Sequence, residues 1–128
     1  MPNLVNRGML GLVAVIIAGC ASPGFHVEGA NAGDTQQCLY LANIDQTPVI
    51  DDNTILAKMK GRGGYKRIDL VNKCVGLRIS DGFSYATSTQ QLCIQDALRV
   101  FSGGGEFCAI KQIVTIDDNE AKGLLAKR

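Results

Sequence analysis

Four cysteines carry the most specific chemical signal in this chain of 128 residues: Cys38, Cys74, Cys93 and Cys108. A zinc site with four cysteine ligands normally contains close C-x-x-C pairs, and a thioredoxin-like redox site needs one such pair. The closest two cysteines of this set, Cys93 and Cys108, are 15 positions apart. We therefore expect no metal site and no redox centre, and we predict that the four thiols form two disulfides.

The chain has few side chains that are suited to catalysis. The only histidine, His26, precedes the region that contains the four cysteines. That region therefore has no histidine that could act as a catalytic base. Two carboxylates that flank a cleft could hydrolyse a glycoside, and the acids available for this are Asp69, Asp81, Asp96 and Glu106. Three of the four adjoin expected turns, and a chain without Trp offers few rings for stacking on a sugar. We predict no catalytic residue and no cofactor, and keep a small hydrolase with paired carboxylates as the alternative.

Two acidic clusters resemble the start of a calcium loop without continuing as one. Residues 51–53 and 117–119 each read Asp-Asp-Asn, but neither cluster is followed by the glycine and the distal glutamate of an EF-hand loop. Asp and Asn also favour turns, because their side chains bond to the nearby backbone. We interpret both clusters as turns.

Basic residues gather around Tyr65, on either side of the glycine-rich segment 61–64. This set consists of Lys58, Lys60, Arg62, Lys66 and Arg67. The sequence favours a solvated pair of edge strands, in which charged side chains prevent aggregation. The alternative is a patch on a hairpin that binds an anionic glycan or lipid headgroup. The glycines do not have the spacing of a phosphate-binding loop.

The N-terminal segment decides the expected compartment. An apolar run from Met9 to Ala18 follows Arg7, and ten residues are too few for a spanning helix, which needs about 20. The residues Ile17-Ala18-Gly19-Cys20 resemble the lipobox of bacterial lipoproteins. This resemblance implies that residues 1–19 are a cleaved signal peptide and that Cys20 carries acyl chains such as palmitate. Ala21 at the next position resembles lipoproteins sent to the outer membrane of Gram-negative cells.

Acylation of Cys20 predicts attachment to the membrane and a domain that faces the periplasm. More than one acyl chain gives a stable anchor where a single chain does not. Arg7 is one of 13 basic residues, so the chain after it holds 12 basic and 12 acidic residues, and we expect no nucleic-acid partner. Residues 20–37, rich in small and polar residues, are expected to form a lipidated N-terminus and a flexible tether.

The region after the tether has the pattern of a small β domain. Alternating or apolar runs predict strands over residues 38–44, 54–60, 65–71 and 107–116, and Asp81-Gly82 predicts a two-residue type I′ hairpin. Residues 88–101 fit either a helix or a turn followed by a strand over residues 97–101, and we favour the strand. We expect a mainly β fold, a small antiparallel barrel or sandwich over residues 38–117 with room for one short helix. A polar tail over residues 118–128 would follow it.

The order of cysteines, turn acids and apolar strands between residues 38 and 116 resembles an uncharacterised family of small exported bacterial proteins with four cysteines. The resemblance implies export and a compact disulfide-bonded domain, and it brings no activity with it. We therefore expect a non-catalytic envelope lipoprotein that binds another protein or an anionic component of the envelope.

The expected hairpin also suggests how the cysteines pair. Cys74 and Cys93 bracket Asp81-Gly82, and a hairpin would bring the two ends of its strands together. Cys38 and Cys108 lie in the first and last expected strands, which are often neighbours in closed β architectures. We predict the nested pairing, Cys74 with Cys93 and Cys38 with Cys108.

Overall fold

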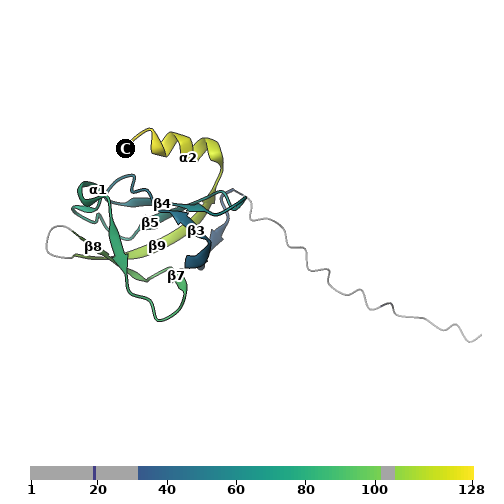
Figure 1. The fold of residues 1–128 in the computed structure, drawn as a ribbon, viewed down its shortest axis with the longest axis horizontal. Helices are drawn as coiled ribbons and strands as arrows, with labels where there is room; N and C mark the ends of the chain where they lie inside the picture. The colour runs from purple at the N-terminus through teal and green to yellow at the C-terminus, as the bar shows by residue number, and fades with distance from the viewer. Residues whose placement is uncertain (1–18, 20–31, 102–105) are drawn as a thin grey trace, which may run out of the picture.

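The fold is mainly β, with one curled antiparallel sheet that forms a half-barrel, two disulfides and short helical segments (Figure 1). The structure, a computed structural model, describes Gly19 and residues 32–101 and 106–128. The mainly β fold with two disulfides that the sequence predicts is therefore confirmed. The expected signal peptide up to Ala18, Cys20, and the tether as far as residue 31 lie outside the described residues.

The larger sheet has the strand order β3-β4-β5-β9-β8-β6, and β1 also pairs with β9. A separate ladder joins β2 to β7, and all of these pairings are antiparallel. The strands are β1 (Thr35–Gln36), β2 (Cys38–Tyr40), β3 (Ile44–Gln46), β4 (Thr54–Met59), β5 (Tyr65–Leu70), β6 (Phe83–Tyr85), β7 (Gln91–Cys93), β8 (Ala97–Val100) and β9 (Phe107–Ile116). The helical segments are the 3₁₀ turn η1 (Leu41–Asn43), α1 (Leu77–Ser80) and α2 (Asp118–Leu125).

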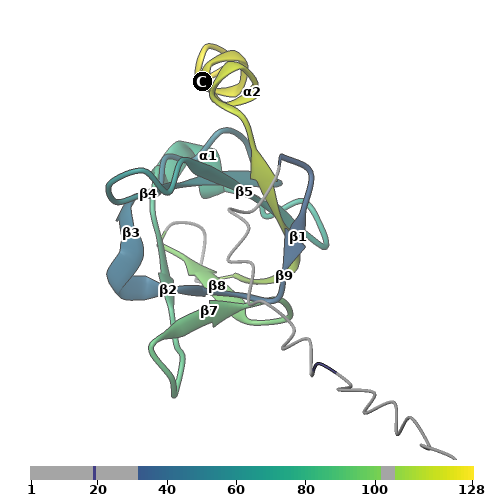
Figure 2. The same cartoon turned by 90° about the vertical axis from the view of Figure 1, so that its right-hand side faces the viewer.

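Strand β9 organises the sheet because it changes partner along one of its edges. The first part of β9 pairs with β8, where Leu98 lies opposite Cys108, and the later part pairs with β1, where Gln36 lies opposite Ile113. Its other edge pairs with β5 from Ile110 to Ile116. The strands consequently follow one another around a ring when the sheet is viewed from its end (Figure 2).

The sheet buries apolar side chains on both faces. On the inner face of the curl, Ile55, Ala57 and Met59 of β4 pack with residues of β5, β8 and β9. The alternation in residues 54–60 itself predicts this face, because these three residues occupy every second position and leave the two lysines of the segment on the other side. Packing in the core confirms it for the three apolar residues. On the outer face, Leu56 packs with Val114 and other residues under α2. The centre of the sheet is therefore covered on both sides, by the curl and by the helix (Figure 2).

The segment expected to be a polar tail forms α2 instead. The Asp117 carboxylate accepts a hydrogen bond of 2.7 Å from the backbone N–H of Glu120, which is the geometry of a helix N-cap. Ala121 of the helix is fully buried against the outer face of the sheet. The expected turn at residues 117–119 is thus the start of a helix, and the folded domain extends beyond residue 117.

The predicted hairpin at Asp81-Gly82 is wrong. Residues 77–80 form α1, in which Leu77 is fully buried while Ile79 is 90% exposed. A strand would have pointed both side chains to the same face. The Asp52 carboxylate accepts a hydrogen bond from the backbone N–H of Arg78, which fixes the start of this helical turn. The expected strand over residues 97–101 is confirmed as β8, after a turn in which Gln95 has a positive φ.

The disulfide pairing predicted from that hairpin is also wrong. The bonds join Cys38 to Cys93 and Cys74 to Cys108. Cys38 and Cys93 lie directly opposite each other in the β2–β7 ladder, with a Cα–Cα distance of 4.0 Å. Cys74 lies in the loop after β5, and because β5 pairs with β9 this loop is brought to Cys108. The two bonds therefore interlock along the sequence and are not nested.

We predict that loss of the Cys38–Cys93 bond strongly destabilises the domain. The bond closes a loop with a sequence separation of 55 residues, and chain entropy alone gives a loop of this length about 4 kcal/mol. The double variant Cys38→Ala/Cys93→Ala should lose about that much free energy of unfolding in urea titrations. Peptide mapping of the non-reduced wild type should recover a fragment that joins Cys38 to Cys93. A fragment that joins Cys38 to Cys108 would contradict the pairing.

Candidate functional site

The basic residues around Tyr65 lie on two different faces of the sheet. Opposite residues of an antiparallel pair share a face, so Arg67 lies with its partner Leu56 on the outer face, near α2. Lys66 is the next residue along β5 and therefore lies on the inner face with Ile68. The structure does not bring the five basic side chains of the sequence-predicted patch together.

Four of these five basic residues contact acceptors within the molecule, and Lys66, which bonds to Thr115, is described below. The Lys58 ammonium lies 3.8 Å from the Asp45 carboxylate, and the Lys60 ammonium donates a hydrogen bond of 2.7 Å to the Ala42 carbonyl. Arg67 binds both Asp69 on its own strand and Glu120 of α2. The Arg67 guanidinium therefore links the sheet to the helix and has a structural role.

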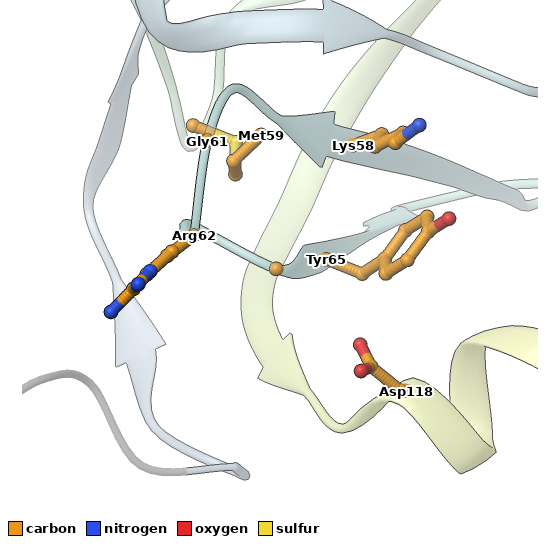
Figure 3. Close-up of a pocket in the computed structure, with 7 residues that line it drawn as sticks. Lys58, Met59, Gly61, Arg62, Tyr65 and Asp118 are labelled. Atoms are coloured by element: carbon orange, nitrogen blue, oxygen red, sulfur yellow. The ribbon is translucent and has the colours of Figure 1, made fainter.

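An open pocket of about 280 Å³ lies on the outer side of the β4–β5 hairpin. The side chains of Lys58 and Tyr65 lie side by side there, and Asp118 approaches from the start of α2 (Figure 3). Arg62 extends from the loop in a different direction, away from Lys58 and Tyr65 (Figure 3). This outer pocket is lined by two basic residues and one acidic residue around a ring, and its polar groups do not converge on one point.

A second pocket, of about 430 Å³, lies between the glycine loop and the end of β9. We call it the inner pocket, and it is lined by Ala32, Arg62, Gly63, Gly64, Lys66, Thr115, Ile116 and Asp117. Glycine is required in the loop, because a Cβ on Gly63 would lie 2.5 Å from the Cβ of Met59. Gly64 has a φ of +66°, in the left-handed region that side chains disfavour. The loop can therefore turn tightly beside the pocket.

Lys66 and Thr115 are the only buried polar or charged residues in the described part of the chain, with 7% and 8% of their surface exposed. They lie opposite each other on β5 and β9, and the Lys66 Nζ donates a hydrogen bond of 2.8 Å to the Thr115 Oγ1. Burial lowers the pKa of Lys66 below its ordinary value of 10.5, and the nearby Asp34 carboxylate acts in the opposite direction. A lysine is almost never buried without a reason, because desolvation of its charge is costly.

The four acids considered for hydrolysis are not arranged as a catalytic pair. Asp69 is held by Arg67 and by a hydrogen bond of 2.6 Å from Gln112, and Asp81 is held by Arg128. Asp96 accepts a hydrogen bond from the backbone N–H of Cys93. No two of the four line either of the pockets described above.

The turn interpretation of the acidic cluster at residues 51–53 is confirmed. The Asp51 carboxylate accepts a hydrogen bond of 2.7 Å from the backbone N–H of Asn53, two residues along the chain. Among residues 32–101 and 106–128, no three His, Cys, Asp or Glu side chains are grouped so that they could hold a metal ion.

Sequence reasoning missed Thr115 and Asp34, and it placed Lys66 on the wrong surface. The signal for Lys66 is present in the strand alternation, because this residue is in phase with Ile68 and Leu70 on the buried face. No local pattern indicates Thr115 or Asp34, since both reach Lys66 only through pairing with distant strands.

We predict that Lys66→Met does not destabilise the protein near pH 7. Replacing a buried charge by an apolar side chain is often neutral or stabilising, and here we expect a gain of up to about 2 kcal/mol in the free energy of unfolding. Removing the lysine leaves no buried charge without a partner, because Asp34 is exposed. Urea titration of the oxidised protein measures this. Lys58→Met, which removes an exposed lysine from the same hairpin, is the control.

The same pair of proteins tests the lowered pKa of Lys66. The unfolded chain keeps the lysine proton up to about pH 10.5, while the folded protein loses it at lower pH. The stability of the wild type should therefore rise relative to Lys66→Met as the pH increases towards about 10.5. A gap between the two proteins that stays constant as the pH rises would contradict the lowered pKa.

No helix in the described part of the chain is long and apolar enough to cross a membrane. Comparisons of the chain with models of protein families, with curated proteins and with solved structures found no match.

Proposed function

We propose that this protein is a lipid-anchored lipoprotein of the bacterial envelope, in which the half-barrel serves as a non-catalytic binding module. The anchor is supported by Ile17-Ala18-Gly19-Cys20, which ends a short apolar run and resembles a lipobox. The two disulfides of the folded domain fit this location, because disulfides persist in oxidising compartments outside the cytosol.

The length of chain between the anchor and the sheet suits such a module. Cys20 is followed by 14 residues before β1 begins at Thr35. A segment of this length spans at most about 50 Å when fully extended. A domain tethered in this way stays close to the membrane surface, where it can meet components of the envelope.

Binding is favoured over hydrolysis by the arrangement of the polar groups. Asp69, Asp81 and Asp96 are each held in separate structural contacts. In contrast, the inner pocket contains Lys66, a buried lysine whose ammonium makes one hydrogen bond, to Thr115. This buried lysine at the wall of a pocket is the observation that carries the assignment of a binding module.

The anchor is tested by Cys20→Ala. Because the acyl chains would be attached at this sulfur, the variant should move from the membrane fraction to the soluble fraction, and it should no longer incorporate radiolabelled palmitate. Ser22→Ala, two residues further on, is the control and should stay in the membrane fraction. Membrane retention of Cys20→Ala at the wild-type level would overturn the proposal.

A second variant tests the membrane to which the protein is sent. Ala21 resembles the residue of lipoproteins that go to the outer membrane, whereas Asp at this position does not. Ala21→Asp should therefore move the protein to the inner-membrane fraction in a density gradient. An unchanged distribution would exclude sorting by this position.

A further inference from the structure

We infer that the inner pocket binds a singly charged oxyanion, the carboxylate or phosphodiester group of an envelope component. Lys66 and Thr115 would contact the anion within the pocket and Arg62 would contact it from the loop. The inference rests on the proposed binding function and adds the site and the class of ligand.

The first step of the argument is the incomplete hydrogen bonding of Lys66. A lysine ammonium has three donors, and the structure gives Lys66 one hydrogen bond, to Thr115 Oγ1. Water is largely excluded from this side chain, which is 7% exposed. The nearby Asp34 carboxylate offsets part of the free-energy cost of removing the Lys66 charge from water. An anionic oxygen in the pocket would accept a further hydrogen bond from Nζ and offset more of it.

The second step is the state of Arg62. This side chain lines the inner pocket and makes no hydrogen bond or ion pair with another residue in the described ranges. Arg62 also borders the outer pocket, but its side chain points away from Lys58 and Tyr65 there (Figure 3). A guanidinium presents its N–H groups as a planar fork, which matches the paired oxygens of a carboxylate or phosphate.

The third step limits the charge of the ligand. Asp117 also lines the inner pocket, and Asp34 lies near Lys66. Two basic and two acidic residues therefore surround the site, so a ligand with two negative charges would meet repulsion that a monoanion largely avoids. A carboxylate and a phosphodiester each carry a single charge. The pocket, at about 430 Å³, is within the ordinary range for small-ligand sites.

The test uses the protein as the cell processes it, purified from membranes into detergent micelles with its disulfides intact. Two probes represent the two sources of the anion: N-acetylalanine carries a peptide carboxylate, and dimethyl phosphate carries the phosphodiester of a lipid headgroup. N-acetylalanine amide is the uncharged control. Each is titrated while the amide signals of ¹⁵N-labelled protein are followed by NMR. We expect saturable shifts at Gly63, Gly64 and Thr115 with at least one anion, and none with the control.

Variants assign the effect to the pocket. Lys66→Met should weaken binding of the anionic probe at least tenfold, and Arg62→Gln should weaken it severalfold. Thr115→Val, which keeps the shape of the side chain, should also weaken binding. It provides the test in case Lys66→Met alters the fold. Lys58→Met removes a positive charge from the same hairpin outside the inner pocket and should bind like the wild type.

Several outcomes would overturn the inference. These are the absence of saturable shifts with both anions, equal shifts with the uncharged control, and wild-type binding by Lys66→Met or by Thr115→Val. If one of the two probes binds more tightly, its identity shows whether the ligand group is a peptide carboxylate or a lipid phosphodiester. Membrane release of Cys20→Ala together with no binding of either anion would leave the anchor standing and exclude this site. Binding together with unchanged membrane retention would exclude only the anchor.

Discussion

The pairing of β9 is the constraint on which the rest of this structure depends. One edge of this strand carries β5, and the other edge carries β8 and then β1. A small domain has little interior in which to bury apolar side chains. Curling the sheet encloses its apolar inner face, which would otherwise be exposed to water. The outer face of the same strand then needs its own cover, which α2 supplies through Ala121 and the Arg67–Glu120 ion pair.

The same pairing creates the candidate site. Lys66 and Thr115 become neighbours only because β5 and β9 are in register, and Asp34 comes near because the chain before β1 follows the other edge of β9. A basic cluster that is continuous in sequence is thereby divided. Arg67 stabilises the outer layer, whereas Lys66 is buried at the wall of the inner pocket. The alternation of side chains along a strand is the physical reason for this division.

The two disulfides reinforce this architecture at different places. Cys38–Cys93 joins the two strands of the small β2–β7 ladder, which is outside the main sheet. Cys74–Cys108 ties the loop after β5 to β9. A two-stranded ladder is marginal by itself in water, so the first bond is important for keeping its two strands paired. Both bonds connect segments that are distant in sequence, which makes them effective against chain entropy.

The sequence by itself determined the mainly β class, the face of β4 that enters the core, the strand β9 and the oxidised state of four cysteines. These features follow from alternation, apolar runs and the absence of C-x-x-C pairs, all of which are local. Tertiary structure decided the pairing of the cysteines, the helical turn at Leu77, the helix after Asp117 and the meeting of Lys66 with Thr115. Each of these depends on which distant segment supplies the neighbour: burial of Leu77 prevailed over the turn preference of Asp81-Gly82, and the outer face of the sheet gave Ala121 a place to pack. Strand register is a long-range property, and a single sequence read locally carries no record of it.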